Sequence, residues 1–299
     1  MLHTLIQGVV VGLVKGGTYG LIAIGLVLVY KGSRVLNFAQ AEVGTLCLYI
    51  TAVLTGDRHV PYAMGALTAV VAAVLIALLF ERWVVRPMAD APRLSVAVAT
   101  IGLFGLALAT EVYFFGPTPY FIPPPIPGRG IVLADVTILP SQLLAFAVIA
   151  LVAAGLAAFL RCTDFGLGVL AAAQDSSAVR LMGIPLHRVS IFTWGVAGAL
   201  SAIAALLIEP TITSVSPGAI GEPLFIGGLA AALLGGMTSL SGAFLGGIVV
   251  GIATSEVEIN VSTGIPHIGS VVLFAIIMGV LLLRPQGLLG RVMARAEVA

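Results

Sequence analysis

The acidic residue Glu42 lies at the start of a long apolar run, shortly after the amide side chains of Asn37 and Gln40. An ionised group at membrane depth costs roughly 3 kcal/mol on insertion scales, so it usually faces a water-filled cavity or an opposite charge. Two roles are open for Glu42. It lines or gates a polar pathway, or it forms an ion pair with Lys31, Arg34 or a basic residue of a partner subunit. The break in the apolar pattern at Asn37 favours a half-helix that points into such a pathway.

Two further ionisable residues, Lys15 and Glu111, lie within apolar runs. The long stem of Lys15 is expected to carry its ammonium group to the membrane interface. Glu111 is close to the outer end of its run, where contact with water is expected. Thr18 and Tyr19 are candidate pathway residues on the face opposite a stripe of small residues. Such stripes favour close helix packing, inside the subunit or against a second one; they comprise Gly12, Gly16 and Gly20, and then Gly242, Gly246, Gly247 and Gly251.

The sequence contains no residue pattern that is typical of catalysis or metal binding. Its four histidines lie near the terminus or in expected loops, without a carboxylate or thiolate at ligand spacing. No phosphate loop of the P-loop form is present, so we expect no enzyme and no ATP site or other cofactor in this chain. Cys47 and Cys162 are expected to be small buried thiols. The net charge of +1 provides no attraction for nucleic acid.

The composition predicts the elements that must position these residues. Of the 299 amino acids, 60% are apolar and 9% charged, with a mean hydropathy of +1.16. Soluble domains contain about a quarter charged residues, so an integral membrane protein is indicated. Backbone groups in lipid must be paired within their own element, which favours helices. The expected fold class is all-α: a single polytopic membrane domain over 1–299, with about eight or nine transmembrane segments and interrupted short helices among them.

The long apolar stretches approach the roughly 20 residues that a membrane span requires. They run from Leu5 to Tyr30, Val35 to Leu54, Pro61 to Phe80, Leu94 to Phe115, Pro140 to Leu160, Val189 to Ile208, Leu224 to Thr254, and Ile268 to Leu283. The stretch that begins at Leu224 is too long for one span, and the glycines and hydroxyls between Gly235 and Gly242 favour a turn. We therefore expect two short helices there, joined by a tight connection.

Basic residues gather in alternate loops, and such residues are retained on the cytoplasmic side. In the nine-span count, eleven of the fourteen face one side: Lys31, Arg34, Arg82, Arg86, Arg93, Arg161, Arg180, Arg188, Arg284, Arg291 and Arg295. This predicts an external N-terminus, a cytoplasmic C-terminus and a cytoplasmic loop at 161–188. The Pro-rich loop at 116–139 is then external, and the apolar segments that flank Ala134 and Asp135 favour a small hairpin.

The cytoplasmic loop contains the pattern of a short helix, which Asp175 or Ser176 can cap and Gly183 can end. A short helix between two spans suits the transfer of force from a soluble motor; an amphipathic surface helix is the alternative. The loop resembles the coupling loop of bacterial ABC-importer permeases, specifically the branched-chain amino-acid permease family of the LivH type. The positions of this ATPase-coupling pattern are Ala172, Asp175, Ala178 and Gly183, with Arg180 among them.

Four other stretches resemble the same family, in the same order along the chain. They are 16–25 with 37–42, then 81–87 with 100–102, the glycine-rich run 235–247, and 284–290. The resemblance implies a permease subunit of an ATP-binding-cassette importer for branched-chain amino acids or a related small polar nutrient, in the bacterial inner membrane. It also adds Thr100 to the candidate pathway residues.

The resemblance further implies the partners of the chain. They are a second permease subunit, homologous or identical, two cytoplasmic ATPases that bind ATP and magnesium, an external solute-binding protein and membrane lipid. Two positions depart from the family pattern: Lys15 stands where an uncharged residue is expected, and Gln40 with Ala41 where His-Gly is frequent. Because both lie close to the expected pathway, urea, amides and other amino acids stay open as substrates.

Two other classes of function stay open. The first is a secondary transporter driven by an ion gradient, in which Glu42 or Glu111 carries a proton. The second is a membrane scaffold that transports nothing, or an intramembrane enzyme. An ion-driven carrier has no need of a coupling loop, so the pattern from Ala172 to Gly183 favours the ATP-driven importer.

Overall fold

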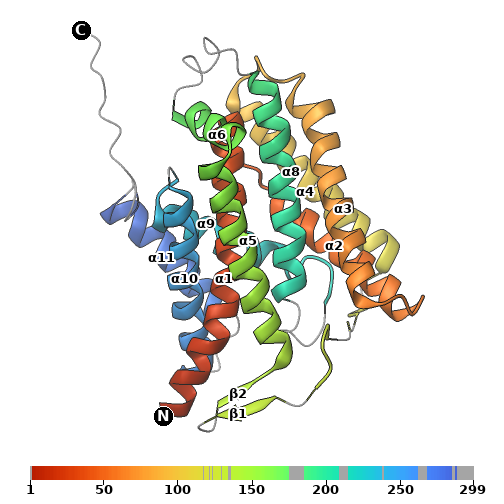
Figure 1. Cartoon of the computed structure of the whole chain (residues 1–299), viewed down its shortest axis with the longest axis vertical. Helices are drawn as coiled ribbons and strands as arrows, with labels where there is room; N and C mark the ends of the chain where they lie inside the picture. The colour runs from red at the N-terminus through yellow and green to blue at the C-terminus, as the bar shows by residue number, and fades with distance from the viewer. Residues whose placement is uncertain are drawn as a thin grey trace.

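The computed structural model describes residues 2–116, 118–120, 122, 124–128, 130–133, 136–174, 185–208, 215–237, 239–261, 268–284 and 287. These residues form a helical bundle (Figure 1). Its long helices are α1 (Leu2–Ser33), α3 (Tyr62–Phe80) with its π-helical extension η1 (Glu81–Val85), α4 (Arg93–Phe115), α5 (Pro140–Cys162), α8 (Leu186–Ile208) and α10 (Leu240–Asn260). Its shorter helices are α2 (Gln40–Gly56), α6 (Asp164–Gln174), α9 (Gly221–Gly235) and α11 (Ile268–Leu283).

Six helices among the described residues are long and apolar enough to cross a membrane. They are His3–Ser33, Tyr62–Val85, Arg93–Phe115, Pro140–Cys162, Leu186–Ile208 and Leu240–Asn260. The helices α2, α9 and α11 have only 17, 15 and 16 residues. The chain is thus a polytopic helical membrane protein. The count of eight or nine spans stays a prediction, because it depends on whether the shorter helices complete a crossing.

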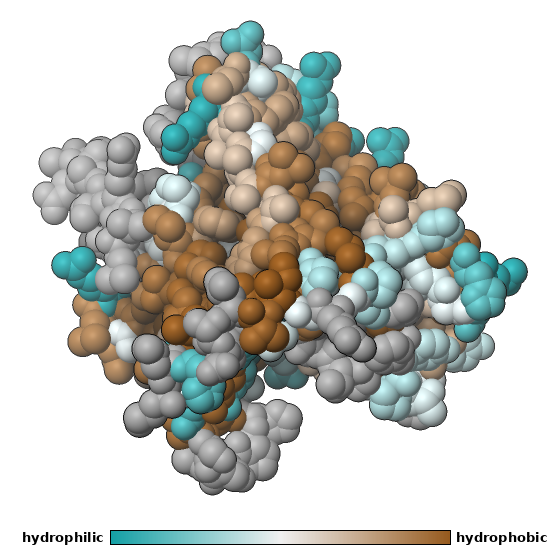
Figure 2. Space-filling model, turned by 60° about the horizontal axis from the view of Figure 1, so that its bottom comes forward, coloured by the Kyte–Doolittle hydropathy of each residue, from teal (hydrophilic) through white to brown (hydrophobic). Residues whose placement is uncertain are grey.

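The surface agrees with a membrane environment. Figure 2 shows apolar residues across the middle of the visible face, with hydrophilic residues mainly toward its edges. Large apolar side chains are exposed on α3, α4, α5 and α11, among them Leu75, Leu106, Leu151 and Leu282. Such a surface is stable in lipid, whereas in water it would drive aggregation.

The predicted division of the long apolar stretch is confirmed. Helix α9 ends at Gly235, and Gly236 takes a φ of 84°, a left-handed conformation that glycine adopts at little cost. The Ser239 hydroxyl then accepts a hydrogen bond from the Gly242 N–H at 3.0 Å and caps α10. Two helices therefore meet at a tight turn, as the glycines and hydroxyls indicate.

The glycine stripes pack inside this chain: Gly247 and Gly251 face the glycines of α1, whereas Gly242 and Gly246 face α9. A methyl group added at Gly12 would lie 2.7 Å from the Ile252 Cα atom, and one added at Gly16 would lie 2.8 Å from the Gly247 carbonyl oxygen. Real side chains do not approach that closely, so α1 and α10 touch through their backbones. The stripes allow helix packing inside the subunit or against a second subunit, and the contact of α1 with α10 is of the first kind.

The two ends of the bundle differ. The N-terminal end of α1 lies beside the strands β1 (Ile131–Leu133) and β2 (Val136–Ile138), with α6 at the opposite end (Figure 1). The strands form the predicted hairpin. The side chain of Gln7, on α1, is hydrogen-bonded to the backbone of Thr137, on β2: its oxygen accepts from the Thr137 N–H at 3.1 Å, and its nitrogen donates to the Thr137 carbonyl oxygen at 3.3 Å. The helix α6 was not predicted; the Thr163 hydroxyl caps it by accepting a hydrogen bond from the Gly166 N–H at 3.0 Å.

Candidate functional site

The start of α2 lies inside the bundle rather than at its end. The side-chain amide nitrogen of Gln40 donates to the Ile22 carbonyl oxygen at 2.9 Å. Helix α1 continues for eleven residues beyond Ile22, to Ser33. At 1.5 Å per residue, α2 begins about 16 Å from the end of α1. The half-helix that the break at Asn37 predicts is therefore present.

Two of the candidate pathway residues hold this break in place. The Asn37 side-chain oxygen accepts a hydrogen bond from the Ala39 N–H at 3.1 Å. The Thr100 hydroxyl, on α4, accepts one from the Phe38 N–H at 3.2 Å. Both side chains satisfy backbone groups that the helix break leaves free, and both are buried. In this conformation Asn37 and Thr100, like the amide nitrogen of Gln40, support the start of α2.

Two buried carboxyl groups lie in the same region, behind the start of α2. Glu42, on α2, and Glu111, on α4, are fully buried and lie close enough to interact electrostatically. The expectation that Glu111 is in contact with water is therefore wrong, because its side chain is fully buried and Gly218 lies against it. Neither oxygen of Glu42 and only one of Glu111 has a hydrogen-bond partner among the described residues, so the ion pair predicted for Glu42 is not observed there.

Tyr49 completes this group, which we call the acidic site: Glu42, Tyr49 and Glu111. Tyr49 lies seven residues after Glu42, on the same face of α2, and it interacts electrostatically with both carboxyl groups. Its ring stacks on Phe115 of α4 at 4.6 Å between ring centroids, which fixes its position. Its hydroxyl is buried without a hydrogen-bond partner among the described residues.

The start of α9 closes the acidic site. The Gly218 N–H donates to Glu111 Oε2 at 3.4 Å, and Gly221, the first residue of α9, packs directly on the carboxyl group of Glu42. Any side chain at position 221 would overlap that carboxyl group, so the close approach requires glycine. The amino end of α9 carries a partial positive charge, which favours a carboxylate at this place.

Thr18 and Tyr19 do not belong to the acidic site. The Thr18 hydroxyl donates to the Lys15 carbonyl oxygen at 2.7 Å, within α1. The Tyr19 ring is buried against Gly227, in the middle of α9, and the Lys15 ammonium nitrogen lies 6.0 Å from the ring centroid. The six candidate pathway residues therefore divide between the start of α2 and the contact of α1 with α9.

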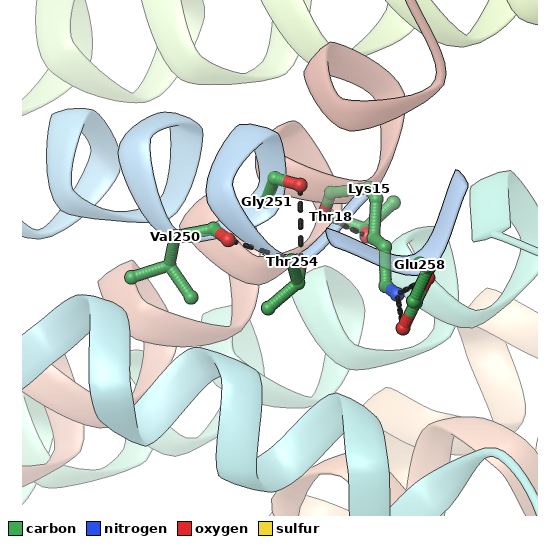
Figure 3. Close-up of polar contacts among 6 residues, drawn as sticks. All are labelled: Lys15, Thr18, Val250, Gly251, Thr254 and Glu258. Atoms are coloured by element: carbon green, nitrogen blue, oxygen red, sulfur yellow. Dashed lines mark hydrogen bonds and ion pairs between the residues drawn. The ribbon is translucent and has the colours of Figure 1, made fainter. Parts of the chain in front are cut away.

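Lys15 forms an ion pair that joins α1 to α10 (Figure 3). Its ammonium nitrogen lies 2.8 Å from each carboxylate oxygen of Glu258. Side chains on a helix lean toward its amino end, and the two helices run in opposite directions, so these side chains reach toward each other. Whether this contact also carries the Lys15 ammonium group to the membrane interface, as expected, stays a prediction. A charge inside an apolar segment is neutralised within the chain.

We expect that Lys15→Met and Glu258→Gln each lower stability by about 1 kcal/mol, because each leaves the other, partly exposed charge without its partner. The double variant should recover most of the loss, since it leaves neither charge. The measurement is the apparent unfolding midpoint of the purified protein, evaluated as a double-mutant cycle. Losses that simply add in the double variant would show that the pair does not stabilise the protein.

Of the coupling residues, only Ala172 lies within the described part of the chain. It is buried near the end of α6, which packs on α5 and α1. Asp175, Ala178, Arg180 and Gly183 lie outside the described residues, so their role stays a prediction. Cys47 is buried as expected, whereas Cys162, at the end of α5, is exposed and corrects the expectation of two buried thiols.

Sequence reasoning missed two residues of these sites, Tyr49 and Glu258. Tyr49 had a usable signal, because a polar ring seven residues after Glu42 lies on the same helix face. Glu258 had none in the local sequence, since 243 positions separate it from Lys15. Among the described residues there is no group of three or more histidine, cysteine, aspartate or glutamate side chains that could hold a metal ion.

Comparison with known proteins gives consistent matches over the length of the chain. A family model described as branched-chain amino acid transport system / permease component matches residues 8–282. The high-affinity branched-chain amino acid transport system permease protein BraD of Pseudomonas aeruginosa is 32% identical over 96% of this chain and 96% of its own. The corresponding LivH protein of Escherichia coli is 30% identical over 94% of each chain.

A solved structure titled PsaBC from Streptococcus pneumoniae in complex with Fab aligns with 94% of this chain and 89% of that chain. The TM-score is 0.44 and the sequence identity 16%, which is too distant to support a conclusion.

Proposed function

This chain belongs to the family of branched-chain amino acid transport system permease components, and we propose that it carries branched-chain amino acids, or a related small polar nutrient, across the bacterial inner membrane. The observation that carries the proposal is the match of the family model to residues 8–282, together with relatives of about 30% identity over nearly the whole chain. These relatives are named as permeases of high-affinity branched-chain amino acid transport systems.

The interrupted helices support a transport role. Both α2 and α9 begin inside the bundle, beside polar groups, which is how membrane transporters commonly build a substrate pathway. An isolated apolar scaffold would have no use for two buried carboxyl groups, because each costs free energy in the membrane. The pathway in this proposal passes the start of α2 and α9, at Asn37, Gln40, Glu42 and Thr100.

The chain has no expected nucleotide site, so ATP and magnesium bind to partner subunits in this proposal. Two cytoplasmic ATPases contact the segment 175–183, a second permease subunit completes the pathway, and an external binding protein delivers the substrate. The basic residues then place the C-terminus in the cytoplasm and the N-terminus outside. The hairpin β1–β2, at the end of the bundle opposite α6, is on the external side in this orientation.

A secondary transporter driven by protons is the second candidate. The specific observation that favours it is the acidic site, because buried carboxyl oxygens that lack partners among the described residues are able to take up protons. The family to which the chain belongs argues for the ATP-driven importer instead.

The substrate is tested by uptake in cells that lack the gene and in cells that carry it on a plasmid. We expect the deletion to remove most high-affinity uptake of radiolabelled leucine, isoleucine and valine, and the plasmid to restore it. Loss of urea uptake with unchanged leucine uptake would contradict the proposed substrate. Unchanged uptake of all these solutes would contradict the transport role.

A further inference from the structure

The acidic site contains more hydrogen-bond acceptors than the described residues use. Both oxygens of Glu42, one oxygen of Glu111 and the Tyr49 hydroxyl are buried and lack partners among the described residues. A buried polar group without a partner costs roughly 1–3 kcal/mol, and an ionised one more. Four such atoms therefore lower the free energy of unfolding, and a ligand that supplies the missing donors would offset this loss.

Three helices contribute to the acidic site. Glu42 and Tyr49 share one face of α2, and the ring of Tyr49 is fixed against α4 near Glu111. Gly218 contacts Glu111 and Gly221 contacts Glu42, and a segment of three residues spans at most about 11 Å. The two carboxyl groups thus lie on either side of one short turn.

We propose that Glu42, Glu111 and Tyr49 bind the primary ammonium group of the transported amino acid; this inference rests on the proposed function. An alkylammonium group has a positive charge and three N–H donors, which match two carboxylates and a hydroxyl. A resident metal ion is a poorer match, because the described residues provide no group of three or more side chains of the usual metal-ligating types there.

Access to the site is through the first turn of α9. In this conformation Gly221 covers Glu42, so a ligand reaches the carboxyl group when the turn moves away. Gly218, three residues before α9 begins, has a φ of 74°, a conformation that other residues rarely adopt. The next residue after Gly221, Glu222, is exposed and interacts electrostatically with Glu42, so negative charge continues from the site to the protein surface.

The test uses the purified transporter with its ATPases, in nanodiscs and without binding protein. Three probes separate the groups of the substrate: L-leucine, 3-methylbutylamine, which lacks the carboxylate, and 4-methylpentanoate, which lacks the amine. We expect leucine and 3-methylbutylamine to raise the apparent unfolding midpoint by at least about 2 °C, whereas 4-methylpentanoate leaves it unchanged.

The variants Glu42→Gln and Glu111→Gln are expected to lose the shift with both amines. Without ligand, their midpoints should equal or exceed that of the parent, because each replaces a buried carboxylate by a neutral amide and so removes the cost of burying a charge. A purely structural carboxylate would give the opposite result, a lower midpoint. Tyr49→Phe, which removes only the hydroxyl, should reduce the shift.

The matched control is Glu81→Gln. Glu81 is also buried in a transmembrane segment, but it has a partner, Arg86, at 3.1 Å. Its replacement should lower the ligand-free midpoint and leave the shift with amines intact. This contrast separates a glutamate that supports the fold from one that awaits a ligand.

Three results would overturn the inference: equal stabilisation by 4-methylpentanoate, a retained shift in both glutamine variants, or loss of folded protein in both. Leucine uptake by the parent protein distinguishes failure of the ammonium site from failure of the proposed transport function. If the parent restores leucine uptake but any of these three results is found, only the ammonium site is wrong. If the parent restores no uptake, the proposed function itself fails.

Discussion

Replacement of Gly251 by valine is expected to remove most of the folded protein from the membrane. Any side chain at this position overlaps the backbone of Gly16, so α1 and α10 must separate. Flexible side chains can move to relieve such an overlap, but backbone atoms can do so only if a whole helix shifts. Overpacking of this kind costs at least about 3 kcal/mol, a large part of the free energy of unfolding of a typical domain.

The matched control is Gly279→Val, on α11. No atom lies within 4 Å of a methyl group added at Gly279, so the same substitution meets open space. The measurement is the amount of monodisperse protein in detergent extract, by fluorescence-detected size-exclusion chromatography. Equal yields of the two variants would show that the glycine contact of α1 with α10 is not needed for folding.

The second large effect is expected at the cytoplasmic segment 175–183. Ala178→Glu should reduce retention of the ATPase during purification at least about tenfold, because it places bulk and an unpaired charge in the proposed contact. Substrate-stimulated ATP hydrolysis should be lost with it. Membrane insertion should be normal, since the segment lies outside the spans.

The same substitution at Ala89 is the control for this experiment. Ala89 is exposed in the turn after η1, and the basic residues place that turn on the same side of the membrane. Ala89→Glu should keep the ATPase and its stimulation. If Ala178→Glu keeps them as well, the coupling segment is wrongly assigned and the ion-driven alternative gains support.

Local patterns in the sequence predict the helical class, the hairpin β1–β2 and the division between α9 and α10. The glycines and hydroxyls from Gly235 to Gly242 determine the turn through backbone freedom and capping, and both act within a few residues. The break at Asn37 likewise predicts a separate start of α2. Its depth follows only from the contact of Gln40 with Ile22, which depends on how α1 and α2 pack.

The acidic site is only partly visible in the sequence. Glu42 stands out because a charge interrupts an apolar run. The sequence predicts that Glu111 contacts water, because its position near the end of an apolar run gives no information about the distant residue Gly218 that lies against it. The ion pair of Lys15 with Glu258 is hidden for the same reason: 243 positions separate its partners, and only the packing of α1 against α10 brings them together.

The central claim is that ATP, bound by partner subunits, drives import through this chain. The most direct measurement is uptake of leucine into proteoliposomes that contain the complete transporter, with ATP enclosed and the binding protein on the opposite side. We predict that uptake requires ATP hydrolysis and continues when ionophores collapse every ion gradient. Uptake without ATP that follows an imposed proton gradient would contradict the claim and identify an ion-driven carrier instead.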